Sequence, residues 1–286
     1  MVRNRPRWAE HADEACALAC LAVAVTKWRT KLPRNVEAEV ACLPAGWCVV
    51  EGWPLEEDAG LPPVARGVRA AVFDATPYLD ALADWAGGQW ARQLCEVPAR
   101  HVVFGVDFRN YCERGHGWEL QALFVFCREA GRVVHATTKF ASPGNWRRWL
   151  FASHDMSRHI VELPAPLGTT LLLDCHDLAA LVQRRATPIG ELRQRRDALR
   201  GLVNRSSPKS VVHVAHTMGK PITWARPIRG LARMAPSIEH HATAGRWERT
   251  LLNRRTGAWA RNPHDLASYA ALVHGMADIL VLVPVE

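Results

Sequence analysis

Hydrophobic and polar positions follow two different periods along the chain. Short apolar runs, each bounded by charged or turn-forming residues, predict β-strands. These runs lie at 46–51, 101–108, 120–140, 168–174 and 210–216, and the third consists of two strands joined by a turn at 128–131. Other stretches place apolar residues on one face of a helix. Strands and helices thus alternate from about residue 46 to the end, which favours an α/β fold.

The helical stretches include 74–94, where an acid-rich start precedes regularly spaced apolar residues, and we expect this helix to be interrupted or to end near Gly87 and Gly88. The first 30 residues predict a helix, or a helix merging into a strand. The arginine-rich stretch 182–205 and the later part of 217–234 also have helical spacing. The segment 265–286 reads as a helix, a glycine and a strand.

The chain predicts one domain over residues 1–286, with 1–40 forming a helical or strand segment of its own, because no linker rich in Gly, Ser or Pro and no internal repeat divides it. A chain of this size buries about 75% of its extended surface, so a large core is available. With 49% hydrophobic and 22% charged residues, the composition excludes a disordered protein.

The composition also bears on location. The longest early apolar run, residues 15–25, is about half the length that a membrane-spanning helix needs. Acidic residues interrupt the approach to it, unlike a signal peptide. Eight cysteines are scattered without the spacing of a disulfide framework, which indicates a reducing, cytoplasmic compartment. Cys16 and Cys20 lie one helical turn apart, a spacing more typical of core packing than of metal binding.

Three predicted strands end on reactive residues, namely Glu51, Lys139 and Cys175. In open α/β sheets, ligands bind at the carboxyl ends of strands. A thiol must lose its proton before it attacks a carbonyl or nitrile carbon, so it needs a base such as glutamate and a nearby positive charge. A lysine can stabilise the oxyanion that forms, together with the backbone N–H after the cysteine, here that of His176.

The stretches "WCVVEGW" (47–53), "GRVVHATTKF" (131–140) and "TLLLDCHDL" (170–178) resemble the signature stretches of the nitrilase, or carbon–nitrogen hydrolase, superfamily. That family carries a Glu-Lys-Cys triad on strand ends in this order. A strand followed by a hairpin whose second strand ends on the lysine is also its arrangement. Asp177, two residues after the cysteine, matches the family's usual acid. The resemblance covers roughly residues 45–225.

The resemblance implies a four-layer αββα sandwich, a homodimer, and hydrolysis or condensation of a small amide or nitrile through a cysteine thioester or thioimidate. Cys175 would be the nucleophile, Lys139 the oxyanion-stabilising cation and Glu51 the general base, with no cofactor and no metal. We expect the substrate pocket to be lined by loops near four residues, which are Trp53, Trp146, His216 and Trp224.

The sequence departs from the family at two points. The loop after Lys139 lacks the second glutamate that the family carries there, and Glu51 is not preceded by the usual proline. Glu286 ends a second stretch that resembles the family's glutamate strand, but it follows the cysteine and would require a permuted topology. Glu51 is therefore the preferred triad acid.

Three alternatives stay open. Aliphatic residues followed by Asp and Cys also resemble the cysteine strand of caspase-like peptidases, in which His116 would serve as the base for Cys175. His213 and His216 could join other histidines at a metal, although strand residues three apart face opposite sides. Finally, the arginines of 182–205 and the net charge of +8 would suit a nucleic-acid-binding or partner-binding module on a degenerate hydrolase fold, although a solvated helix face is the simpler interpretation.

Overall fold

The computed structural model describes residues 18, 21–22, 25–26, 29, 38–43, 45–51, 72–111, 117–141, 149–182, 191–217, 221–246, 270–273 and 279–282. These residues form two β-sheets and the helices that cover them. Sheet A has the strand order β12-β13-β1-β4-β5-β7-β3, with β2 also paired to β4 and β6 to β5. Sheet B has the order β11-β10-β9-β8. The α/β prediction is confirmed.

Sheet A is built around two long antiparallel strands, β4 (Ala99–Tyr111) and β5 (Gly117–Cys127). Strands β1 (Ala38–Cys42) and β2 (Cys48–Glu51) follow one another along β4, both parallel to it. Along β5 run β6 (Arg132–Thr138), antiparallel, and β7 (Trp149–Ala152), parallel. The outer strands are β3 (Val72–Asp74), β12 (Ala270–Val273) and β13 (Ile279–Leu282).

Sheet B consists of β8 (Ile160–Leu163), β9 (Gly168–Asp174), β10 (Ser210–Thr217) and β11 (His240–Arg246). Strand β10 lies between β9 and β11 and is parallel to both. Three helices follow the strands of this sheet, α3 (Asp177–Val182), α4 (Glu191–Ser206) and α5 (Pro221–Met234). Helix α2 (Leu79–Leu94) belongs to sheet A.

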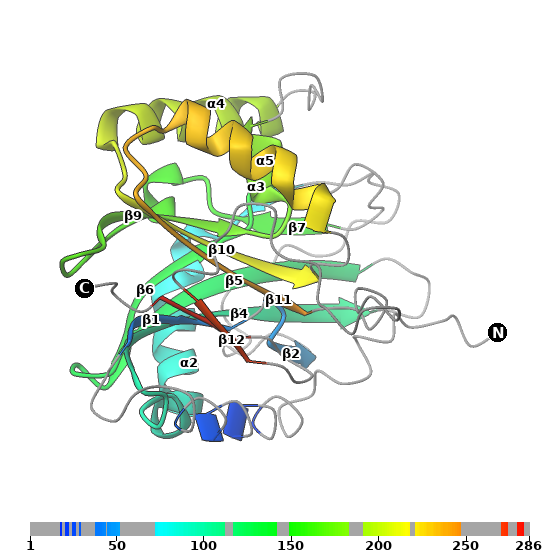
Figure 1. Ribbon diagram of the computed structural model, residues 1–286. Helices are drawn as coiled ribbons and strands as arrows, with labels where there is room; N and C mark the ends of the chain where they lie inside the picture. Colours follow the sequence, from blue (N-terminus) through cyan, green and yellow to red (C-terminus); the bar gives the residue numbers. More distant parts are fainter. Residues whose placement is uncertain are drawn as a thin grey trace, which may run out of the picture.

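Three hydrophobic cores show how these elements are layered. One core joins α2, through Trp90, to Phe104 and Phe124 of sheet A. The next joins the other face of sheet A to sheet B, with Leu123 meeting residues such as Leu172. The third joins the far face of sheet B to α3, α4 and α5. Figure 1 shows the resulting order, with α2 below, the two sheets between, and α3, α4 and α5 above.

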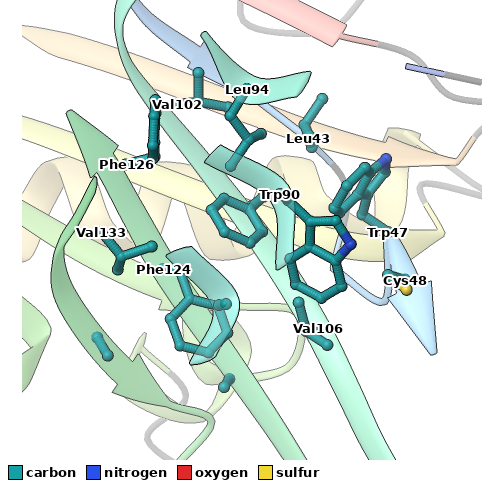
Figure 2. Close-up of a cluster of buried hydrophobic side chains, with 14 of the residues drawn as sticks. Leu43, Trp47, Cys48, Trp90, Leu94, Val102, Val106, Phe124, Phe126 and Val133 are labelled. Carbon is teal, nitrogen blue, oxygen red and sulfur yellow. The ribbon is translucent and has the colours of Figure 1, made fainter. Parts of the chain in front are cut away.

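The loop before β2 is fixed by a close approach to β4. A Cβ on Gly105 would lie 2.7 Å from the Cα of Ala45, so only glycine fits at this position without a shift. The backbone N–H of Trp47 donates to the carbonyl of Gly105 at 2.9 Å. The Trp47 ring then meets Trp90 of α2 edge to face, with centroids 5.4 Å apart (Figure 2). These contacts set where β2 begins and so where Glu51 lies.

Two predictions about helices are wrong. Helix α2 neither breaks nor ends at Gly87 and Gly88, because Trp90 and Leu94 continue its buried face and Gly87 packs against β6. The segment 265–286 holds the paired strands β12 and β13 where a helix followed by a strand was expected. Its β-branched and aliphatic residues pair with β1, and such pairing overrides local helical spacing.

The N-terminal helix prediction is confirmed at the described positions 18, 21–22, 25–26 and 29, where Leu21 and Val25 pack into the same core as Trp90 of α2. Cys16 and Cys20 lie outside the described residues. In the described part of the chain, none of the helices combines the length and the apolar character needed to cross a membrane.

Candidate active site

The structure places the three proposed triad residues directly at strand ends. Glu51 is the last residue of β2, in register with Arg109 of β4. Lys139 follows β6, and Cys175 follows β9. The predicted strand-end positions of the three residues are therefore confirmed. The side chain of Glu51 lies outside the described part of the structure.

The other expected site residues are described only in part. His216 lies in β10 and Trp224 in α5, with their side chains outside the described part of the structure. His176 is exposed between β9 and α3. The remaining candidates lie outside the described residues, and these are Trp53, His116, Trp146 and Glu286.

Cys175 occupies a tight turn between β9 and α3. Its φ angle is 35°, in the left-handed region that costs a non-glycine residue about 1–2 kcal/mol. Strand β10 holds it there at two points. The Cys175 N–H donates to the Val214 carbonyl at 2.5 Å, and the Cys175 carbonyl lies 2.9 Å from Nε2 of His213. The cysteine is 6% exposed, so its thiol is largely shielded.

Lys139 is buried, with 2% of its surface exposed, and Gln121 of β5 holds it twice. The ammonium group donates to Oε1 of Gln121, and the Lys139 backbone N–H donates to the Gln121 carbonyl at 2.9 Å. The hydrogen bonding of the hairpin β5–β6 thus fixes both ends of this lysine. Burial of a charged ammonium is costly unless it is paired and hydrogen-bonded.

Asp177, the first residue of α3, joins the lysine segment to the cysteine turn. Its Oδ1 accepts from the N–H groups of Phe140 and Ala141 at 3.1 and 2.9 Å, directly after Lys139. Its Oδ2 accepts from the N–H of Asp174 at 3.2 Å, directly before Cys175. One fully buried carboxyl group therefore holds both segments that carry the proposed catalytic groups.

Contacts, charge interactions and strand register join these residues into a polar cluster, and each of its members is at most 2% exposed. The cluster consists of Asp107, Gln121, Lys139, Asp174 and Asp177. Asp107 and Gln121 are register partners on β4 and β5. Both were missed as site residues. The sequence did contain a feature that could have identified them, because each is a polar residue inside an otherwise apolar strand.

Burial raises the pKa of the Asp177 carboxyl well above its usual range, and the neighbouring Asp174 raises it further, while Lys139 opposes the shift. Strand alternation puts Asp174 on the face of β9 that carries Leu172, and its register partner Val214 belongs to the same core as Leu172.

His213 is buried on β10, and burial lowers its pKa to about 4. The ring is therefore neutral near pH 7. Because a carbonyl oxygen can only accept a hydrogen bond, the Nε2 that faces Cys175 carries the proton. Within the described residues, no group of three or more His, Cys, Asp or Glu side chains is placed to hold a metal ion.

The arginines of 182–205 were expected to lie on a solvated helix face. For two residues of helix α4 this expectation is wrong. Arg195 and Arg196 are buried. Arg195 donates to Nε2 of His154 at 2.8 Å, and Arg196 pairs with Asp197 at 2.9 Å. Arg195 therefore attaches α4 to the loop after β7, whereas the pair of Arg196 with Asp197 lies within α4 itself.

No protein-family model and no curated protein sequence matches the chain. Among solved structures, it is similar to glutamine-dependent NAD+ synthetase from Acinetobacter baumannii, with 16% identity and a TM-score of 0.42 over 82% of this chain and 37% of that one. It is also similar to a mutant of the Nesterenkonia AN1 amidase from the nitrilase superfamily, with 11% identity and a TM-score of 0.41 over 89% of this chain and 93% of that one.

Proposed function

We propose that the protein is a nitrilase-like carbon–nitrogen hydrolase that cleaves a small amide or nitrile through a covalent bond to Cys175. The observation that carries this proposal is the double attachment of Asp177. It holds the backbone beside Lys139 and the backbone beside Cys175, which come from different sheets. A buried lysine and a strained cysteine turn held by one carboxyl group suit a preorganised site.

Glu51 is proposed as the base, and the pairing of its strand supports this role. Cys48 and Val50 pack on the face of sheet A that meets α2. Strand alternation assigns position 51 to the opposite face, which also carries Asp107 and Gln121. This is the face of sheet A on which Gln121 contacts Lys139.

With an amide substrate, Glu51 takes the thiol proton and the sulfur of Cys175 forms a bond to the carbonyl carbon. The carbonyl electron pair moves to oxygen, where Lys139 and the His176 N–H stabilise the negative charge. Return of that pair breaks the carbon–nitrogen bond, and Glu51 gives its proton to the departing ammonia. Water, deprotonated by Glu51, then cleaves the thioester and releases the carboxylic acid. A nitrile would form a thioimidate at the first step.

The test is ammonia release from a panel of short aliphatic amides and nitriles. Wild type is expected to release ammonia from at least one of them, and Cys175→Ala, Lys139→Met and Glu51→Gln each to lose at least about 100-fold of that rate. Lys209→Met, at an exposed lysine, is the matched control and should keep it. Undiminished release by Cys175→Ala, or none by wild type from the whole panel, would contradict the proposal.

A further inference from the structure

The carbonyl of Cys175 and the N–H of His176 belong to the same peptide unit. A trans peptide is planar, and its C=O and N–H bonds point in opposite directions. Whatever fixes the direction of the Cys175 carbonyl therefore also fixes the direction of the His176 N–H. In the proposed reaction, that N–H is a donor to the oxyanion, so its direction matters for the rate.

His213 is the side chain that holds this carbonyl. It lies on β10, in register with Leu173 of β9, and its Nε2 is 2.9 Å from the Cys175 oxygen. The next residue, Val214, accepts the Cys175 N–H. Two successive residues of β10 thus hold both backbone groups of a residue whose left-handed φ needs such support.

The proton on Nε2 is donated to the Cys175 carbonyl. His213 therefore differs from the base of a Cys-His dyad. A dyad base must present an unprotonated nitrogen to the thiol. Here the nitrogen nearest the cysteine backbone donates, and the ring contributes no positive charge near pH 7 because its pKa is about 4. His213 can therefore act on the reaction through geometry.

We propose that His213 is a positioning residue for oxyanion stabilisation, fixing the Cys175–His176 peptide so that the His176 N–H faces the place where the oxyanion forms. This proposal rests on the proposed function, in which Cys175 attacks a carbonyl carbon. It assigns a role to a residue that does not touch the reacting atoms.

Two reagents separate this role from a general structural one. With p-nitrophenyl acetate, the Cys175 thiolate bonds to the carbonyl carbon, an oxyanion forms, and its collapse expels p-nitrophenolate to leave an acetyl thioester. With iodoacetamide, the sulfur bonds to the methylene carbon as iodide leaves, and no oxyanion develops. The ratio of the two rates at Cys175, measured by peptide mass spectrometry, reports oxyanion stabilisation alone.

The informative pair of variants is His213→Met and His213→Gln, which have similar length but differ in the N–H donor. We expect the acylation-to-alkylation ratio to fall about 10–100-fold in His213→Met and to recover most of the way in His213→Gln. His159→Leu is the matched control, because His159 is equally buried and bonds the Leu172 carbonyl at 2.9 Å, away from the cysteine turn. Its ratio should not change.

Each other outcome is decisive. An equal fall of both rates in His213→Met, or an unchanged ratio, overturns the positioning role while leaving the proposed function intact. Failure of wild type to become acylated at Cys175 overturns the proposed function and this inference with it. Should His213→Met not fold, the ¹⁵N chemical shifts of the His213 imidazole in wild type test the inference instead, because they report which ring nitrogen carries the proton. An Nε2–H tautomer between pH 5 and 8 supports the inference, and an Nδ1–H tautomer overturns it.

Discussion

The Oδ1 atom of Asp177 accepts a hydrogen bond from the backbone N–H of Ala141 at 2.9 Å, and this contact connects α3 with the segment that follows Lys139. The same oxygen accepts from Phe140, and Oδ2 accepts from Asp174. Three backbone donors from two segments therefore depend on one buried side chain.

Removing this carboxyl group should cost stability. Asp177→Ala leaves three buried N–H donors without their acceptor, and we expect it to lower the free energy of unfolding by about 3–5 kcal/mol. Asp177→Asn keeps one oxygen that can accept from Phe140 and Ala141, so its loss should be smaller. Denaturant unfolding measures both.

The control is Asp155→Ala. Asp155 is exposed, and its Oδ1 accepts from the N–H of Ser157 at 2.9 Å. Its loss should cost about 1 kcal/mol, as for other exposed helix caps. Equal costs for Asp155→Ala and Asp177→Ala would show that the bridge between the two segments contributes nothing beyond a local cap.

Two glycines should respond in opposite directions to alanine. Gly105→Ala places a Cβ 2.7 Å from the Cα of Ala45, which forces the loop before β2 to move and should lower stability by about 1–3 kcal/mol. Gly88 lies exposed in α2 with nothing within 4 Å of a Cβ. Gly88→Ala should therefore raise stability by about 0.5–1 kcal/mol. Thermal unfolding of both variants tests the close approach at Gly105, and a neutral Gly105→Ala would refute it.

His159 should make the protein sensitive to acid. Burial lowers its pKa from 6.5 to about 4. Between these values the unfolded chain binds a proton that the folded protein does not, so stability falls as the pH is lowered from about 6.5 to 4. The shift corresponds to about 3 kcal/mol at the acid end.

His159→Asn removes this titration and keeps an N–H that can reach the Leu172 carbonyl. The stability difference between wild type and His159→Asn should therefore shift by about 3 kcal/mol in favour of the variant between pH 7 and pH 4. Taking the difference cancels the groups that both proteins share, including Asp177. A difference that stays constant over this range would contradict the pKa shift of His159.

The sequence predicted the strands that carry the site because their apolar runs are long and end sharply at charged residues, as in β9 before Cys175. It missed the short strands β3 and β8, which are only three and four residues long, and β3 forms through pairing with β7, far along the chain. It also predicted that α2 would be interrupted or end near Gly87 and Gly88, where buried residues on both sides in fact continue the helix.

The candidate site, like the strands, was predicted in part. Lys139 and Cys175 were proposed as site residues because they end strands within family-like motifs, and the structure bears out those strand-end positions. Gln121 and His213 were not assigned roles there, because their contacts follow from strand register, which sequence spacing does not reveal. His213 was considered as a metal ligand, with a single polar or core histidine as the simpler interpretation, whereas its Nε2 in fact lies against the Cys175 carbonyl.

The central claim is that Lys139, and not His116, activates Cys175. The direct measurement is the rate of iodoacetamide labelling at Cys175 against pH in wild type, Lys139→Met, His116→Ala and the control Lys209→Met. Loss of a nearby positive charge should raise the apparent pKa of the thiol in Lys139→Met, leaving the other two variants like wild type. A raised apparent pKa in His116→Ala, with Lys139→Met unchanged, would contradict the account and favour a Cys-His peptidase.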